Sequence, residues 1–546
     1  MKKNEKKLIG MLNEAQKHID AKNWSLAKKL ILETRLAEKG NFAVIFQLGW
    51  CLMHLGHPEQ ALPLMARVES ICDKNTVVLN SVALAYIHMH QWEPATRVLL
   101  RAIKLEPSNI DSYLNLAAVY NNLAQHKKSL DVCLKAVALD ISNVSAHLNM
   151  GSALLGLGFS NDAKVAFETC LTLAPDNLDA TFNLAVLASR GSEPLESVKI
   201  YEKYIQLAYS ASHAKLNLAR YYLSYEYLRA GDLVRGWEMY EYGFDPLIPA
   251  YVARAPARQF SAPRWSGNYI PGKRLLVWAE QGIGDEILFL SCMRNLFAYC
   301  ENIILECEPR LVSVMARSFP TLTVRSSAYS KHNFNHSVFN DFDFQIPLGS
   351  LPMLFRKSLE DFKHVMPYVV TNIDKRDVFN SRLSLFEGKL KVGICWRSGL
   401  LSAERNSGYS AIRDWGDLLK IQNCIFVNLQ YGECESEIAE VEALFGITIL
   451  RWDDLNLKKD IDDVYALLDC LDLVVTAATA VNPMAGSIGK ATLLLQDSWA
   501  WTNIGTDYYP WFPNTRCFVP ESGSSPAEVM PYIAAIVSNI ADSSTQ

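Results

Sequence analysis

A step of 34 residues, repeated through the first half of the chain, constrains the fold more than any other feature. Small side chains recur at this step, where the second helix of a pair has to approach its neighbour closely: Ala27, Ala61, Ala95, Ser129 and Ala163. Further columns keep the same register: Ala83, Ala117, Gly151 and Ala185; Tyr86 and Tyr120; Pro107 and Pro175. A fixed period of this length predicts stacked helix pairs, in which each pair buries its apolar face against the next.

The pattern resembles the tetratricopeptide repeat and covers residues 5–240, which predicts about seven repeats. A column of polar residues, here called the polar column, is expected on the first helix of each pair: Asn13, Gln47, Ser81, Asn115, Asn149, Asn183 and Asn217. Because an amide both donates and accepts, this column predicts a surface that holds an extended peptide backbone; alternatively, the side chains only satisfy neighbouring turns. The asparagines also resemble the ladder in the repeat domain of protein O-GlcNAc transferases, which implies a protein substrate.

Composition disfavours several classes of partner. The net charge of −5 gives no support for nucleic-acid binding, and no apolar run approaches the roughly 18 residues of a membrane span. The first residues are not those of a secretory signal. The 12 cysteines include no Cys-x-x-Cys pair, which indicates reduced, packed thiols rather than disulfides or zinc ligands. We therefore expect a cytoplasmic protein that binds neither nucleic acid nor membrane.

A chain of 546 residues is expected to hold more than one domain. Five prolines between Pro246 and Pro271 exclude a continuous helix there, and Phe260, Trp265 and Tyr269 predict that this segment packs against the rest. The sequence predicts repeats over 1–243, a proline-rich linker over 244–272, a first lobe over 273–387, and a second lobe over 388–546 with a C-terminal helix packed back across the lobes.

Two series of strands alternating with helices follow the linker. The first comprises Leu275–Trp278, Ile303–Leu305, Thr323–Arg325 and Phe342–Ile346. The second comprises Lys391–Trp396, Cys424–Leu429, Ile447–Leu450, Leu471–Thr476 and Ala491–Leu495. Two such series predict two facing Rossmann-like α/β lobes with a ligand site between them.

The turn at Gln281–Glu286 allows three interpretations. Asp285 can simply cap the helix that follows the first strand. Gly282 and Gly284 can begin a dinucleotide-binding loop with Glu306 as its acid, but Ile287 replaces the third glycine. The third interpretation is a sugar-transferring site with Asp285 as general base, and the rest of the chain favours it.

Three stretches carry a resemblance to the heptosyltransferase-related glycosyltransferases of the GT-B fold. They are Gln281–Asp285, Val392–Leu400 and Asp472–Gly486. The fused repeats, together with Trp396–Gly399, Asn428–Gly432 and Trp511–Pro513, are similar to bacterial flagellin O-glycosyltransferases, which place a nonulosonic acid such as pseudaminic acid on Ser or Thr of flagellin. The implied fold is a tetratricopeptide superhelix followed by a GT-B transferase of two Rossmann-like lobes.

The resemblance implies roles for matching residues. Asp285 would take the proton of the acceptor hydroxyl, while Gln281 and the amides of Gly282 and Gly284 would orient the acceptor. In the second lobe, the turn of Trp396, Arg397, Ser398 and Gly399 would hold the donor phosphate, with Arg397 as its cation. Gln430 and Tyr431 would face the base or the sugar, unless they merely end a strand.

The chain departs from the heptosyltransferase pattern at one loop. The usual Asp and His are Ala478 and Pro483 here, while Thr479 remains. A CMP-sugar carries one phosphate rather than two, so the loss of this His favours a CMP-linked nonulosonate; otherwise the site is degenerate. The backbone amides of Thr479, Ala480, Val481 and Asn482 would still hold the phosphate.

Other acidic clusters are weaker candidates. Asp341 and Asp343 imitate a metal-binding Asp-x-Asp motif but are expected to be structural. Asp460, Asp462 and Asp463 look like the acidic start of a helix, and Arg405 is a second possible phosphate ligand. No cluster has metal-ligand spacing, so the prediction is a metal-independent transferase without a cofactor.

The sequence thus predicts a protein O-glycosyltransferase acting on flagellin, with a nucleotide-sugar donor. Two alternatives remain open: a repeat scaffold whose lobes have lost activity, and a heptosyltransferase-like enzyme that uses an ADP- or UDP-sugar.

Overall fold

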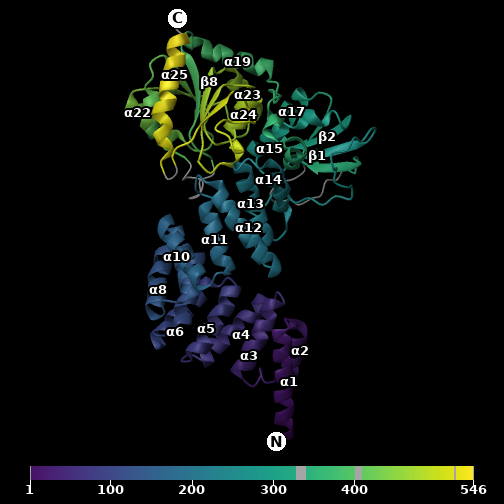
Figure 1. The fold of residues 1–546 in the computed structure, drawn as a ribbon, viewed down its shortest axis with the longest axis vertical. Coiled ribbons are helices and arrows are strands. Elements are labelled where there is room, and N and C mark those ends of the chain that lie inside the picture. The colour runs from purple at the N-terminus through teal and green to yellow at the C-terminus, as the bar shows by residue number, and fades with distance from the viewer. Residues whose placement is uncertain (1, 328–339, 400–408, 522–523, 545–546) are drawn as a thin grey trace. The chain divides into compact units, whose positions relative to one another are not determined.

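The computed structural model describes residues 2–327, 340–399, 409–521 and 524–544 (Figure 1). The chain divides into two compact units, Met1–Leu187 and Ala188–Gln546. The described part of the first unit is helical, whereas the second unit adds two parallel sheets. None of the described helices combines the length and the apolar character that crossing a membrane requires.

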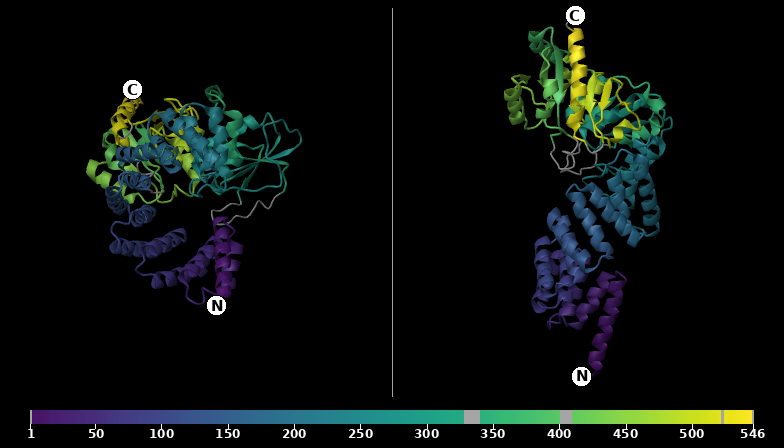
Figure 2. Two further views of the ribbon diagram at one scale, coloured as in Figure 1. Left: turned by 60° about the horizontal axis from the view of Figure 1, so that its bottom comes forward. Right: turned by 60° about the vertical axis from the view of Figure 1, so that its left-hand side comes forward.

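Successive helix pairs build the first unit, and Figure 2 shows them stacked one after another. The helices are α1 (Lys2–Asp20), α2 (Trp24–Thr34), α3 (Phe42–His54), α4 (Pro58–Ile71), α5 (Thr76–His88), α6 (Trp92–Leu105), α7 (Ile110–Asn122), α8 (His126–Leu139), α9 (Val144–Gly156), α10 (Ser160–Leu173) and α11 (Leu178–Ala188). The small residues of the predicted 34-residue column are fully buried: Ala27, Ala61, Ala95, Ser129 and Ala163. Their burial is explained by close packing between helices.

A second column of asparagines begins the first helix of successive pairs. It comprises Asn41, Asn75, Asn109, Asn143 and Asn177. Each side chain accepts a hydrogen bond from the backbone amide three residues later, at 2.8–3.2 Å. An N-terminal cap of this kind stabilises a helix by about 1 kcal/mol. This column, which the sequence analysis did not single out, therefore sets where each repeat starts.

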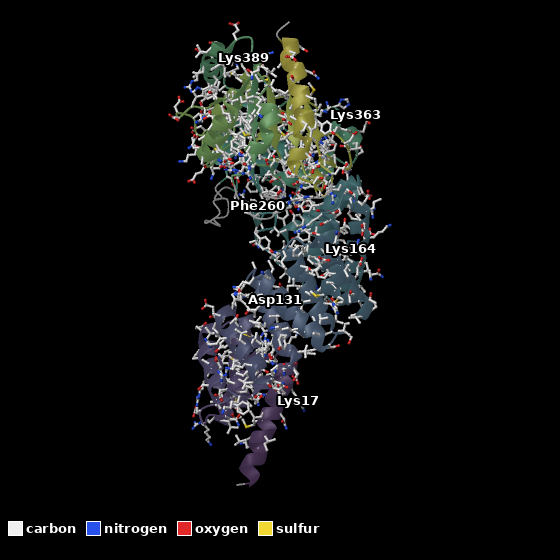
Figure 3. The ribbon with its side chains drawn as sticks, turned by 90° about the vertical axis from the view of Figure 1, so that its left-hand side faces the viewer. Lys17, Asp131, Lys164, Phe260, Lys363 and Lys389 are labelled. Carbon is white, nitrogen blue, oxygen red and sulfur yellow. The ribbon has the colours of Figure 1, made fainter. Side chains whose placement is uncertain are left out.

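Three more helices precede the sheets and belong to the second unit. They are α12 (Pro194–Ser210), α13 (Leu216–Arg229) and α14 (Leu233–Tyr240), followed by the 3-10 turn η1 (Glu241–Phe244). The proline-rich segment that follows is packed, as expected. Trp265 is buried, and Phe260, which is labelled in Figure 3, lies against Trp278 and Phe342 at ring-centroid distances of 5.6 and 5.7 Å.

The first sheet is parallel, with strand order β3-β2-β1-β4. Its strands are β1 (Arg274–Trp278), β2 (Asn302–Cys307), β3 (Thr323–Ser326) and β4 (Phe344–Pro347). The helical segments with it are α15 (Ile283–Leu290), α16 (Met293–Leu296), α17 (Val312–Ser318), η3 (Leu348–Ser350) and α18 (Leu351–Phe355). All four strands match predicted strands; β1, β2 and β4 are short, largely apolar runs between turns, whereas β3 (Thr-Val-Arg-Ser) is more polar and not buried.

The second sheet is also parallel, with order β10-β9-β8-β5-β6-β7. Its strands are β5 (Leu390–Cys395), β6 (Cys424–Asn428), β7 (Ile449–Leu450), β8 (Leu473–Ala477), β9 (Thr492–Leu495) and β10 (Thr515–Phe518). Its helices are α19 (Ile373–Leu383), α21 (Gly416–Leu419), α22 (Glu435–Phe445), α23 (Ile461–Cys470), α24 (Val481–Ser487) and α25 (Met530–Ser544). Strand β10 was not predicted, since Thr-Arg-Cys-Phe is short and half exposed.

The C-terminal helix does not follow the expectation that it crosses both lobes. The buried residues Met530, Ile533, Val537 and Ala541 of α25 belong to the core of the second sheet. In Figure 1 this yellow helix lies along the strands of that sheet.

One apolar core joins α13 and α14 to both sheets. It contains Tyr221, Trp237 and Tyr240 from these helices, Phe289 from α15 and Trp511 from the second lobe. Trp237 lies 6.1 Å from Trp511 between ring centroids. Because these helices are part of this core, the second unit begins at residue 188 rather than at the end of the helical segment near residue 243.

Candidate active site

The turn between β1 and α15 is held in an unusual backbone conformation. Gln281 has a φ of +67°, a region that residues other than glycine rarely adopt. Its side-chain Nε2 donates to the hydroxyl of Tyr240 at 2.5 Å, and its amide donates to the carbonyl of Ala255 at 2.7 Å. Helix α14, before the linker, and the linker itself therefore fix the residue that introduces the turn.

Asp285 lies in the first turn of α15 and is half-buried. Its carboxylate accepts from the amide of Gly282 over 3.4 Å, a long contact that caps the helix. The helix-capping interpretation thus describes part of what this side chain does. Because the bond is weak, it is compatible with a second role for the carboxylate.

Four buried phenols lie within electrostatic reach of Asp285. Burial raises the pKa of Tyr221 to about 12 and holds the pKa values of Tyr225, Tyr240 and Tyr509 well above the ordinary value; the Asp285 charge adds to each shift. The first three come from α13 and α14, whereas Tyr509 follows β9. The Asp285 charge therefore acts on buried, neutral hydroxyls from two parts of the second unit.

A buried ionic cluster lies next to this turn. Arg254 is fully buried and donates to Glu280 through Nε at 3.1 Å and Nη2 at 2.5 Å, and to Glu241 through Nη1 at 3.0 Å. Burial alone would lower the pKa of Arg254, but the two carboxylates raise it well above its usual value. Glu280 also accepts from the amide of Gly349 at 3.1 Å. The sequence analysis missed this cluster, whose members are scattered over more than 100 positions.

Glu286, next to Asp285, is a buried acid. It accepts from the amide of Glu308 at 3.0 and 3.3 Å through its two carboxyl oxygens. Burial raises the pKa of Glu286 to about 8, against which this hydrogen bond acts. Neighbouring carboxyl groups in one helix turn thus have different environments, since Asp285 is half-buried and Glu286 only 3% exposed.

In the second lobe, two side chains that were predicted to bind the donor instead form hydrogen bonds within the protein. Trp396 is buried, and its indole donates to Glu437 at 2.7 Å. Gln430 is 1% exposed; its Oε1 accepts from the amides of Trp396 and Arg397 at 3.1 and 3.0 Å, and its Nε2 donates to the carbonyls of Arg397 and Tyr431 at 2.9 and 3.0 Å. These bonds favour a structural role for both side chains, fastening the ends of β5 and β6.

Arg397 already has an anionic partner. Its guanidinium forms an ion pair with Glu437 and donates through Nη2 to the carbonyl of Glu433 at 2.7 Å. Burial opposes ionisation of Glu437, but hydrogen bonds from Arg397 and Trp396 lower its pKa. A phosphate would have to share Arg397 with this carboxylate. The same turn also contains buried Ser398 and exposed Gly399, whose missing side chain leaves room for the Tyr431 ring.

The loop after β8 meets the Asp285 turn. A Cβ built on Gly284 would lie 3.4 Å from Cα of Ala480 and 3.8 Å from Cγ of Pro483. Within the loop, Val481 donates its amide to Thr479 Oγ1 at 3.3 Å, and Asn482 donates its amide to the Thr479 carbonyl at 3.2 Å. Two of the four amides predicted to bind phosphate are therefore used inside the loop.

A cavity of about 390 Å³ opens beyond the carboxyl ends of β6 and β7. Its lining includes Tyr431, Arg451, Trp452, Asn456 and Lys458. It thus combines aromatic faces, hydrogen-bonding groups and cations. Of the predicted donor residues, Gln430 and Tyr431 line it.

The predicted asparagine ladder is divided between the two units. Asn115, Asn149 and Asn183 belong to the first unit, and Asn149 Nδ2 donates to the carbonyl of Leu114 at 3.2 Å. Asn217 belongs to the second unit, where it donates to Asp245 at 2.6 Å and accepts from Arg220 at 2.9 Å. These bonds give Asn217 a structural role.

The weaker acidic candidates form ion pairs. Asp341 pairs with Arg325 and Asp343 with Lys273, while Asp462 pairs with Arg317 and Asp463 with Lys375. Asp460 instead accepts from the amide of Asn456 at 3.1 Å. Arg405 lies outside the described residues. Within the part of the chain that the structure describes, no group of three or more His, Cys, Asp or Glu side chains could hold a metal ion.

Comparison with known proteins identifies the repeats. Family models described as tetratricopeptide repeat match residues 98–131 and 144–177. The chain is 31% identical over 381 residues to Protein FlbA of Caulobacter vibrioides, which covers 68% of this chain and 63% of FlbA. The chain therefore spans less than two thirds of that relative's length.

Solved structures match the chain over shorter stretches. The crystal structure of MamA is 20% identical with a TM-score of 0.28, over 32% of this chain and 93% of MamA. The first tetratricopeptide domain of human RPAP3 is 26% identical with a TM-score of 0.21, over 21% of this chain and 89% of that domain. The two family matches confirm that the chain contains tetratricopeptide repeats.

Proposed function

We propose that this protein is a metal-independent O-glycosyltransferase of the GT-B type that acts on flagellin. The observation that carries the proposal is the contact between two loops: the Asp285 turn, at the carboxyl edge of one parallel sheet, meets the Ala480–Pro483 loop at the carboxyl edge of the other. Open α/β sheets bind ligands at this edge. A half-buried carboxylate at such a junction suits a general base.

The reaction follows from the chemistry of that carboxylate. The oxygen of a Ser or Thr hydroxyl attacks the anomeric carbon of the donor, and its proton passes to Asp285. The bond between the anomeric carbon and the phosphate oxygen breaks, and the nucleotide leaves with the electron pair. A positioned general base contributes typically 10²–10⁴-fold to such a step.

The cavity beyond β6 and β7 supports the donor side of the proposal. Its volume of about 390 Å³ lies within the common range of small-ligand pockets. Tyr431 and Trp452 offer faces for a base, and Lys458 offers positive charge to a phosphate. A phosphate would have to share Arg451 with the carboxylates that already pair with it. The favoured donor is a CMP-linked nonulosonic acid such as pseudaminic acid, because Pro483 replaces the His expected for a diphosphate.

The repeats support the proposal that the acceptor is a protein. Tetratricopeptide repeats generally bind proteins, which suits a protein acceptor recruited through the first unit. The name of the Caulobacter relative fits a flagellum-associated role. Flagellin is therefore the acceptor that we propose.

A repeat scaffold without transferase activity is the second candidate. One observation favours it: Arg397, the cation proposed for the donor phosphate, is already paired with Glu437. In that case the lobes would only bind a partner.

The intact mass of flagellin from the host separates the two functions. Cells would carry the wild type, Asp285→Ala, or a deletion of residues 1–187, the compact first unit. The transferase predicts that Asp285→Ala removes a repeated sugar mass although the variant still folds. A glycan mass that survives Asp285→Ala but disappears with the deletion would identify a scaffold.

A further inference from the structure

An apolar pocket opens among the first helices of the three N-terminal pairs. Its volume is about 390 Å³, and α1, α3 and α5 line it. Phe42, Phe46 and Trp50 contribute aromatic rings from α3. Gln47 and Ser81, two members of the polar column, line the same pocket. The polar column and the pocket therefore lie on the same face of the first unit.

The aromatic rings of the pocket pack against one another, and the lining is uncharged. Ring centroids of Phe46 and Trp50 lie 5.7 Å apart, and Trp50 meets His88 edge-on at 5.6 Å. Gln47 Nε2 donates to Gln16 Oε1 at 2.8 Å, which fixes the amide at the rim. Of the described residues that line the pocket, none carries a formal charge. An ionised side chain placed there would lose water without gaining a partner.

The face continues beyond the pocket. The first helices of successive pairs, α3, α5, α7 and α9, contact one another in order. Asn115 lies on α7 and Asn149 on α9, in the same phase as Ser81. Amide side chains suit the backbone of an extended chain, whereas the pocket suits one side chain of it.

We propose that this pocket anchors one large apolar side chain of an uncharged, extended segment of the acceptor protein. The polar column holds the backbone of that segment whatever its sequence. The pocket sets the register, because it determines which residue of the segment lies opposite it. This deepens the proposed function, on which it rests only in taking the bound protein to be the acceptor. Burial of apolar surface in a preformed pocket is the driving force.

Photocrosslinking with a defined peptide tests the anchor. The probe is an uncharged decapeptide of Ser, Gly and Asn with one benzoylphenylalanine at its centre, added to the full-length protein. We expect adducts on Phe42, Phe46 or Val78, located by mass spectrometry. Excess unlabelled decapeptide with Leu or Phe at the centre should reduce labelling at least fivefold, whereas the same peptide with Asp or Lys should not.

Matched substitutions provide the control. Ser81→Arg puts a charge at the pocket without removing a packed ring, and should reduce labelling about tenfold. Leu100→Arg adds the same charge on α6, where Leu100 is 49% exposed and does not line the pocket, and should leave labelling unchanged. Thermal melting verifies that both variants fold.

Adducts confined to other helices, equal competition by the Asp peptide, or full labelling of Ser81→Arg would each overturn the proposal. Labelling needs no sugar transfer, so these results do not depend on whether the protein is a transferase. The flagellin mass measured in Ser81→Arg cells then links the pocket to the acceptor: a reduced sugar mass supports the link, and an unchanged mass refutes it.

Discussion

Gln281 has a positive φ, and hydrogen bonds to two other residues hold it in this conformation. The hydroxyl of Tyr240 accepts from its side chain, and the carbonyl of Ala255 accepts from its amide. A non-glycine residue in this region costs of order 1–3 kcal/mol, and it persists where the surroundings over-determine it. The strain lies four residues before Asp285, where it fixes the direction in which α15 begins.

Tyr240→Phe is expected to loosen this turn. Without the hydroxyl, the rate of transfer should fall about tenfold while the KM for the donor stays constant, and stability should fall by about 1 kcal/mol. Kinetics with purified flagellin and a urea titration measure both. Tyr225→Phe is the control, since its hydroxyl donates to Tyr221 at 2.6 Å in the same aromatic cluster. Equal rates for the two variants would refute a positioning role for Tyr240.

Glu286 should make stability depend on pH. Burial raises its pKa from 4.5 to about 8, so between these values the folded protein binds more protons than the unfolded chain. The contribution of Glu286 to the free energy of unfolding is therefore complete below pH 4.5. It is lost as pH rises through about 8, by at most about 1.4 kcal/mol per pH unit.

Glu286→Gln removes this titration while preserving shape. Urea unfolding of the wild type and the variant at pH 5, 6, 7 and 8, followed by tryptophan fluorescence, should show a shallower decline for the variant. Parallel declines would mean that Glu286 does not titrate in this range.

At the scale of elements, a buried ionic cluster joins four segments. Glu241 belongs to η1, Arg254 to the linker, Glu280 to the turn after β1, and Ser350 to η3. Arg254 Nη2 donates to Ser350 Oγ at 3.0 Å, and Ser350 Oγ donates to Glu241 at 2.6 Å. The cluster holds the linker against the base of the Asp285 turn.

Arg254→Met should be strongly destabilising. It leaves Glu280 and Glu241 without their buried partner, and breaking such a pair costs about 3–5 kcal/mol. Arg264→Met is the matched control, because Arg264 also pairs with Glu241 but its side chain is 39% exposed. Thermal melting compares them; similar melting temperatures would contradict the importance of the buried cation.

The elements also show which inferences a sequence supports. The 34-residue columns predicted the helix pairs, and short strand-like runs predicted nine of the ten strands in the described part of the chain. Periodicity and composition are local, so they carry this information. The Arg254 cluster depends on residues distant in the chain. The hydrogen bonds between Gln430 and the Trp396 turn form because the ends of β5 and β6 lie side by side. No local sequence pattern predicts that proximity.

At the scale of the whole molecule, the boundary between the units decides which part of the chain is needed for the candidate active site. Helices α13 and α14 contribute Tyr221, Trp237 and Tyr240 to the core that both sheets share. They are therefore structural parts of the second unit as much as a continuation of the repeats.

Two deletions test this division. Removal of residues 1–187 should leave a folded second unit with a cooperative melt, whereas removal of residues 1–240 should leave apolar core exposed and give an aggregating product. Circular dichroism and size-exclusion chromatography compare the two products. Cooperative folding after removal of residues 1–240 would show that α13 and α14 are dispensable.

Reconstitution of the reaction from purified components would show whether Asp285 catalyses sugar transfer to flagellin. Purified protein, unglycosylated flagellin and CMP-pseudaminic acid would be mixed, and the mass of flagellin followed with time. We expect stepwise addition of one sugar mass with release of CMP, slowed at least 100-fold by Asp285→Asn. No addition by the wild type, or equal rates for Asp285→Asn, would contradict this expectation.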